Sequence, residues 1–136
     1  MNFILKTILF SLVSLNLWAA EDVGKASNEA VEQVRNTMIN ESAREKYIND
    51  NPNTRPADRQ LTELVGNGAL KQESYQLSAD IFKYLIDKHA GDPIKAQEEL
   101  LKAMKDPKAF LGTLPDNYKD KIRQIAAEVE AKNKKP

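Results

Sequence analysis

The chain has 136 residues, no cysteine, and 20 basic against 20 acidic side chains. A chain of this length is expected to form one domain, and the absence of cysteine excludes disulfide scaffolds, cysteine-ligated metal centres and thiol nucleophiles. The balanced charge argues against a dedicated nucleic-acid binder, because such proteins carry a basic surface.

Residues 1–20 have the pattern of a secretory signal peptide. Lys6 provides a short basic region, Thr7–Trp18 form an apolar run, and Ala19 and Ala20 are small enough for a signal peptidase. Cleavage is expected after Ala19 or Ala20, and the protein is then expected to have no membrane attachment. The sequence therefore predicts an exported protein, either periplasmic or secreted.

The alternative for the same segment is an uncleaved membrane anchor. Phe3–Ala20 is interrupted by Lys6 and Asn16 and is at the short end of the roughly 17–25 residues that a membrane-spanning helix needs. A signal peptide is the favoured interpretation, which leaves residues 21–136 as a single helical domain.

The mature part of the chain shows helical periodicity and no strand pattern. A first helix is expected over about 28–50, with Val31, Val34 and Met38 on one face. Beyond Ile39 this apolar stripe ends, which predicts that the second half of the helix either turns away from the core or frays. Residues 49–53 are rich in turn-forming residues.

A short helix is expected next, with Thr54 as its N-cap and its end at Gly66–Gly68. The following helix, over about 70–90, has apolar residues around roughly 200° of its circumference, more than a surface helix needs. It is therefore expected to be the central helix, packed on more than one side. Ser74 and Ser78 lie inside this apolar arc, where a hydroxyl can bond the carbonyl four residues earlier or can let another helix approach closely.

The remaining chain predicts two longer helices separated by a short one. Asp92 and Pro93 suit the N-cap and first position of a helix, Asp106–Pro107 start a short turn, and a last helix is expected over about 116–132, followed by a frayed basic tail at 133–136. The fold class is therefore all-α: a compact small bundle or orthogonal array of four to six helices.

His89 is the only histidine and lies in the last turn of the expected central helix. It could act as a general base or a metal ligand. The favoured interpretation is that it interacts with the last carbonyl groups of its helix, where the helix dipole also favours a cation. A metal site would need further ligands, and the sequence offers only carboxylates.

Three acidic residues, Glu73, Asp80 and Asp87, recur every seven residues on one face of the same helix. Neighbours in this row are about 10.5 Å apart along the axis, which is too far for one ion. The face is expected to be a solvated surface. No catalytic residue, metal or cofactor is expected anywhere in the chain, since no carboxylate pair, nucleophile elbow or phosphate-binding loop occurs.

Two features suit contact with a partner. The first is the pair Tyr47 and Ile48 beside the polar turn of Asn49–Arg55, because loops and exposed aromatic residues often carry recognition. The favoured interpretation of this segment is a plain connector. The second is a narrow apolar seam on the last helix. Because it covers under two heptads, packing on its own domain is the favoured interpretation. The seam consists of Tyr118, Ile122, Ile125 and Val129.

The expected function is that of a small exported bacterial envelope protein, a non-catalytic binding module whose partner is another envelope or secreted protein. One alternative is a carrier of an apolar ligand, for which an enclosed apolar cavity of ~300 Å³ or more at the central helix would be the evidence. Another is a small helical enzyme or enzyme inhibitor that uses His89. The substitution His89→Ala would abolish histidine-dependent catalysis and leave a binding module competent.

Overall fold

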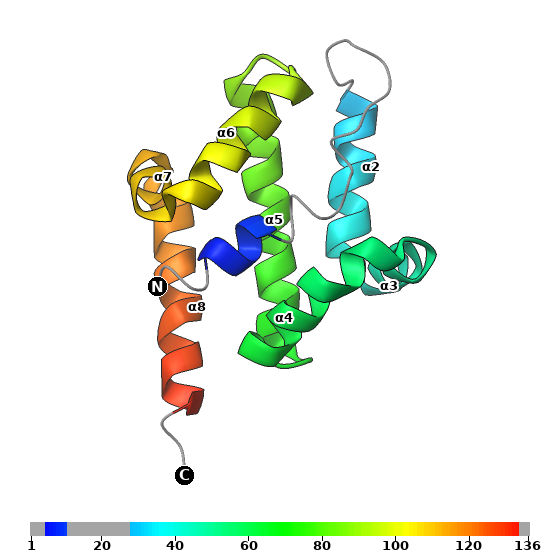
Figure 1. The fold of residues 1–136 in the computed structure, drawn as a ribbon, viewed down its shortest axis with the longest axis vertical. Coiled ribbons are helices and arrows are strands. Elements are labelled where there is room, and N and C mark those ends of the chain that lie inside the picture. Colours follow the sequence, from blue (N-terminus) through cyan, green and yellow to red (C-terminus); the bar gives the residue numbers. More distant parts are fainter. Residues whose placement is uncertain (1–4, 11–27, 134–136) are drawn as a thin grey trace.

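The computed structural model describes residues 5–10 and 28–133, and these residues form helices and connecting turns without a strand (Figure 1). One helix spans residues 5–10. The others, in chain order, are α2 (Asn28–Ile39), α3 (Glu41–Asp50), the 3₁₀ turn η1 (Pro52–Thr54), α4 (Arg55–Val65), α5 (Ala69–Lys88), α6 (Pro93–Lys105), α7 (Pro107–Thr113) and α8 (Asp116–Asn133). The all-α fold predicted from the helical periodicity is therefore confirmed.

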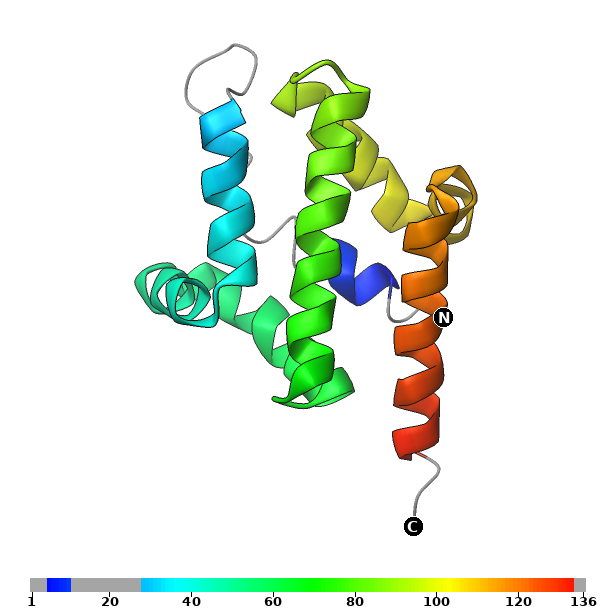
Figure 2. The same cartoon turned by 180° about the vertical axis from the view of Figure 1, so that it is seen from behind.

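The central position of α5 is also confirmed. Helices α2, α4, α6 and α8 all pack against it, and Figures 1 and 2 show α2 on one side of it and α8 on the other. Nine of its twenty residues are buried. This packing on several sides is the reason for the wide apolar arc in its sequence.

The two serines of α5 sit inside the core and bond within their own helix. Ser74 Oγ donates to the carbonyl of Leu70 at 2.7 Å, and Ser78 Oγ donates to the carbonyl of Ser74 at 2.9 Å. Both side chains are fully buried. The predicted bond to the carbonyl four residues earlier satisfies each hydroxyl without a partner from another helix.

The segment expected as one helix over 28–50 is broken at Asn40. Asn40 has an extended backbone and its side chain accepts from the amide of Ala43 at 3.0 Å, so it caps the start of α3. The second half of the segment thus turns away from α2, one of the two expected outcomes. This break, together with the helix at 5–10, gives the described residues more helices than the four to six expected.

The caps at the other helix ends follow the sequence in part. Asp92 accepts from the amides of Ile94 and Lys95 at 3.0 and 3.2 Å, as predicted. Thr54 occupies the N-cap position of α4 but makes no capping bond. Its hydroxyl donates instead to the carbonyl of Asn51 at 2.7 Å, because the preceding 3₁₀ turn brings that carbonyl within reach.

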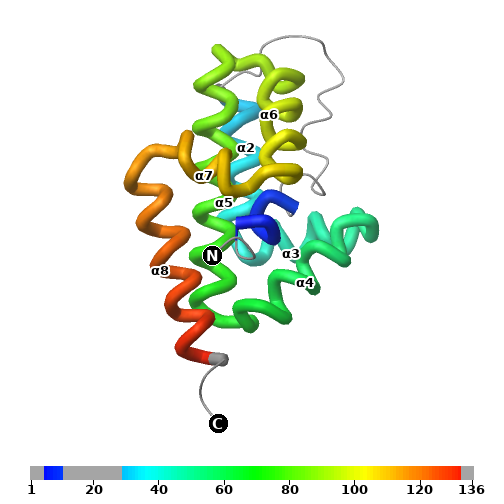
Figure 3. Tube along the Cα trace, turned by 60° about the vertical axis from the view of Figure 1, so that its left-hand side comes forward, coloured from blue at the N-terminus to red at the C-terminus, as the bar shows by residue number. Residues whose placement is uncertain are grey.

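Residues 5–10 form a helix that is inserted into the core. Leu5, Ile8 and Leu9 are fully buried and belong to the same apolar cluster as residues of α2 and α4–α8. Figure 3 shows this helix between α4 and α6, on the side of α5 that faces them. The rest of the predicted signal peptide, including its cleavage site, and residues 134–136 of the predicted basic tail lie outside the described residues.

Within 5–10 and 28–133, no helix is both long enough and apolar enough to cross a membrane.

Candidate functional site

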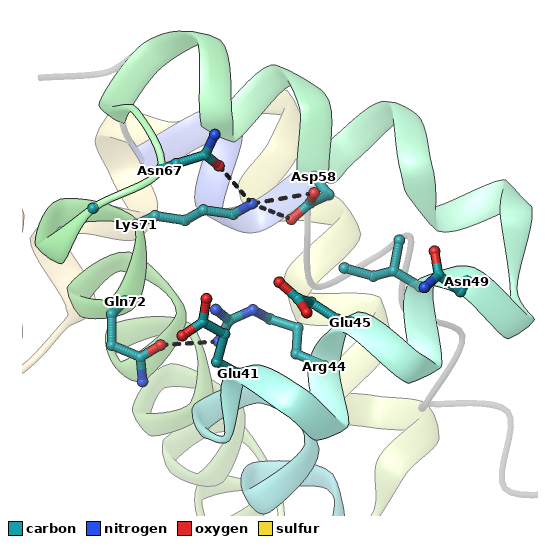
Figure 4. Close-up of a pocket in the computed structure, with 10 residues that line it drawn as sticks. Glu41, Arg44, Glu45, Asn49, Asp58, Asn67, Lys71 and Gln72 are labelled. Atoms are coloured by element: carbon teal, nitrogen blue, oxygen red, sulfur yellow. Dashed lines mark hydrogen bonds and ion pairs between the residues drawn. The ribbon is translucent and has the colours of Figure 1, made fainter.

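A polar pocket of about 440 Å³ opens between α3, α4 and the start of α5. Figure 4 shows two facing walls. One carries Asp58, Asn67 and Lys71, and the other carries residues of α3. The full lining consists of Glu41, Arg44, Glu45, Ile48, Asn49, Asp58, Asn67, Gly68, Lys71 and Gln72.

Arg44 anchors the α3 wall and is itself buried, with 5% of its surface exposed. Its Nη1 donates to the carbonyl of Met38 at 2.7 Å and to Oε1 of Gln72 at 3.1 Å. The guanidinium carbon lies 4.3 Å from the ring centroid of Tyr75, in cation–π geometry. A buried cation is expensive unless it is well partnered, and here the partners come from α2 and α5.

Gln72 completes the same corner. Its Nε2 donates to the carbonyl of Ile39 at 2.5 Å, while Arg44 bonds the carbonyl of Met38. These two carbonyl groups belong to the last residues of α2, and the last carbonyls of a helix have no amide donor within the helix. The side chains of Arg44 and Gln72 therefore satisfy the end of α2, and they fix the α2–α3 corner against the first turns of α5.

Asp58 organises the opposite wall. The hydroxyl of Tyr75 donates to its Oδ1 at 2.6 Å, and Nζ of Lys71 lies 3.2 Å from the same oxygen. Burial raises the pKa of Tyr75 above its ordinary value, and the hydrogen bond to the Asp58 carboxylate raises it further. Tyr75 is therefore a neutral hydrogen-bond donor at any physiological pH. Its hydroxyl contacts the Asp58–Lys71 ion pair and its ring contacts the guanidinium of Arg44, so it connects the two walls.

Two carboxylates of the pocket have no such partner. Glu41 and Glu45 are exposed and line the pocket on the α3 side. Among the ion pairs of the described residues, neither carboxylate takes part in one. The pocket thus has three carboxylates against two cations, and the surplus negative charge lies on the side chains that remain free to meet a ligand.

Of the first predicted contact pair, Ile48 lines this pocket and Tyr47 does not. Ile48 is buried, yet it lines the pocket and is not part of the main apolar cluster. Tyr47 is half-buried against the core, and this burial raises the pKa of its phenol. Asn49, the first residue of the predicted recognition turn, also lines the pocket.

The second predicted contact surface is mostly core. Ile122, Ile125 and Val129 are buried in the main cluster, so the last helix packs on its own domain, as the favoured interpretation expected. Tyr118 is half-buried and its ring meets that of Tyr84 edge-on at 6.0 Å between centroids. Packing within the domain therefore accounts for all four side chains of the seam.

His89 has a different partner from the one expected. Its Nε2 lies 2.8 Å from Oε1 of Glu99 on α6, and Nζ of Lys88 lies 3.0 Å from the other oxygen of that carboxylate. The imidazole therefore joins α5 to α6 instead of capping carbonyls of its own helix. The described residues contain no group of three or more His, Cys, Asp or Glu side chains that could hold a metal ion.

The acidic row on α5 is less solvated than expected. Asp80 accepts from Nη2 of Arg35 on α2 at 3.0 Å, because α2 packs along this face. Asp87 pairs with Lys83 at 3.0 Å within α5. Burial opposes the charge of Arg35, but its bonds to Asp80 and Glu32 outweigh this and raise its pKa.

Sequence reasoning missed Arg44, Asp58, Lys71 and Gln72. They come from three helices, and each reads in the sequence as one more polar residue on an amphipathic helix. The only local signal near the pocket was the Asn-rich turn after Ile48, which marks one edge of it.

Comparison of the chain with protein-family models, curated proteins and solved structures found no match. The function is therefore inferred from the residues described above.

Proposed function

We propose that the protein is a small, non-catalytic binding protein of the bacterial envelope, and that its polar pocket receives a basic side chain of an exported partner protein. The observation that carries this proposal is the pair of carboxylates Glu41 and Glu45, which form no ion pair within the part of the chain that the structure describes, in a pocket whose other charged groups are already engaged. A lysine or arginine from a partner supplies the missing counter-charge.

The size and lining of the pocket suit such a side chain. At about 440 Å³ the pocket is in the range of ligand sites, with room for one long side chain and part of its backbone. Ile48 offers an apolar contact for the methylene groups of lysine or arginine, whose stems bury readily while their charged ends reach polar groups. Asn49 and Asn67 offer amide groups for hydrogen bonds to the partner's backbone.

The wall that holds these carboxylates is rigidly placed. Arg44 lies between Glu41 and Glu45 on α3 and is tied to α2 and α5 through Met38 and Gln72. A site whose supporting side chains are fixed before binding loses less entropy on association. The buried Arg44 is therefore a positioning residue in this proposal, and Glu41 and Glu45 make the contact.

The test is crosslinked affinity capture of tagged protein from the intact producing cell, with mass spectrometry of the captured partner. We expect a stoichiometric partner that the double variant Glu41→Gln/Glu45→Gln loses. The matched control is Glu128→Gln/Glu130→Gln, which makes the same charge change at exposed positions of α8. The proposal is wrong if both double variants capture the partner equally well, or if the crosslinks map away from α3.

A purified-component experiment tests the charge preference directly. Titration calorimetry with a tetra-lysine peptide is expected to show binding that weakens with added salt, and a tetra-glutamate peptide is expected to give no heat. Equal binding of the control and pocket variants to tetra-lysine would show that net charge, rather than the pocket, attracts the peptide.

A further inference from the structure

The helix at residues 5–10 occupies a helix-sized site, called the seat below, whose apolar lining contacts its aliphatic side chains. Leu5, Ile8 and Leu9 stand at positions i, i+3 and i+4, the spacing that lines up one face of a helix, and all three are fully buried. Thr7 is 6% exposed, whereas Lys6 faces solvent. One face of this short helix is therefore core, and the other is surface.

The seat lies between helices that both rest on α5. Figures 1 and 3 show the 5–10 helix between α4 and α6. A pocket of about 500 Å³ opens beside it, lined by Lys6, Thr7, Phe10, Pro56, Arg59, Gln60, Glu63 and Met104. The seat is thus open to solvent along one side, and its rim carries charges of both signs.

The sequence predicts that the segment in this seat is removed on export. Cleavage after Ala19 or Ala20 takes away the 5–10 helix, together with the three aliphatic side chains that complete the core between α4 and α6. The mature domain would then expose an apolar groove with the width of one helix. An exposed groove of this kind usually marks an interaction site.

We propose that in the exported protein this groove, named here the helix seat, binds a short amphipathic helix of another protein that carries aliphatic residues at i, i+3 and i+4. In this chain the seat fully buries all three aliphatic side chains of a helix with that pattern. Helix-in-groove recognition uses the same three anchors. Residues 5–10 occupy the seat in the full chain, and the partner helix takes their place after cleavage.

The helix seat is separate from the polar pocket. On α4, the rim residues Pro56, Arg59, Gln60 and Glu63 cluster on one face, and Asp58 of the polar pocket lies nearly opposite them at 100° per residue. Loss of binding at one site therefore leaves the other site in place, and the two proposals fail independently.

The experiment starts from the protein as the cell exports it. Protein purified from the envelope or medium is subjected to N-terminal sequencing, and we expect it to begin at Ala20 or Glu21. A fluorescent peptide of residues 3–12 then serves as the probe in an anisotropy titration. We expect saturable binding that is at least about tenfold weaker for the same peptide with Ile8→Asp, because a carboxylate would be buried without a partner.

A pair of variants tests the seat from the protein side. Met104→Glu places a carboxylate where Met104 lines the pocket beside Phe10, and it is expected to weaken binding of the native peptide by about tenfold. Ile94→Glu makes the same kind of change on α6 about 15 Å along the axis, at a side chain that is 52% exposed. This control is expected to bind normally.

Several outcomes would overturn the proposal. An exported protein that still begins at Met1 keeps its seat filled, so no groove exists for a partner. A mature protein that fails to bind the native peptide, or that binds the Ile8→Asp peptide equally well, has no helix seat. Saturable binding of a small apolar dye, without binding of the peptide, would point instead to an apolar-ligand carrier.

Discussion

Replacing Arg44 by methionine tests the central element of the proposed site. Methionine keeps the unbranched apolar stem and removes the charge and the donors, so packing is largely conserved. The variant loses the bonds to Met38 and Gln72 and the stack on Tyr75. It also leaves the carbonyl of Met38, at the end of α2, without that donor.

The expected cost follows from these contacts. A hydrogen bond that involves a charged group contributes about 1.5–3 kcal/mol, and a desolvated cation–π contact about 2 kcal/mol. Relief from burying the cation offsets part of this sum. We therefore expect a net loss of about 2–4 kcal/mol, which at about 4 °C per kcal/mol lowers Tm by about 8–16 °C.

The assay is thermal unfolding followed by circular dichroism at 222 nm, with Arg123→Met as the matched control. Arg123 is 57% exposed, and among the described residues its ion pair is with Asp120 of its own helix, so the control is expected to change stability by no more than about 0.5 kcal/mol. If Arg44→Met and Arg123→Met unfold at the same temperature, the anchoring role assigned to Arg44 is wrong.

Three further measurements test other parts of the structure. Because the folded pKa of Tyr75 is raised above the ordinary value of 10.0, the unfolded chain loses this proton first. Ionisation of Tyr75 therefore leaves the stability unchanged below pH 10.0, and above it the free energy of unfolding falls by about 1.4 kcal/mol per pH unit. Alkaline titration followed at 295 nm should show one phenol that ionises only when the protein unfolds. The variant Tyr75→Phe should lack this ionisation. Ala90→Gly should stabilise the protein by about 0.5–1 kcal/mol in urea unfolding, because Ala90 has a φ of 54° and glycine adopts this conformation without strain; a destabilised variant would contradict this. His89→Ala should cost about 0.5–1.5 kcal/mol by removing the bond to Glu99, and it should leave partner capture intact, whereas loss of capture would implicate the histidine in function.

Much of the fold could be predicted from the sequence because helix formation depends mainly on residues that are close together in the chain. The apolar arc of the 70–90 segment predicted a central helix. Bonding to the carbonyl four residues earlier was one of the two roles expected for its serines, and Ser74 and Ser78 both form this bond. Asp92 capped α6 as expected, since an N-cap depends on residues only two or three positions away. The end of the apolar stripe at Ile39 also marked the place where the chain turns.

Long-range partners could not be predicted in this way. His89 bonds Glu99, which comes ten residues later in the chain on a different helix, and Asp80 meets Arg35 because α2 lies along that face. The polar pocket combines α3, α4 and α5, and no spacing within one helix signals that these side chains converge. The alternation of polar and apolar residues says which face of a helix is buried, but not which neighbour buries it.

The sequence alone therefore determined the all-α class, the positions of most helix ends and the central helix, because each depends on residues within one or two turns. Tertiary packing decided which charges meet, which apolar seam is core and where the pocket opens. It also placed Leu5, Ile8 and Leu9 inside the domain, although the sequence pattern shows only an apolar run at these positions. These features depend on how the helices cross, and that is set by the whole set of buried side chains acting together.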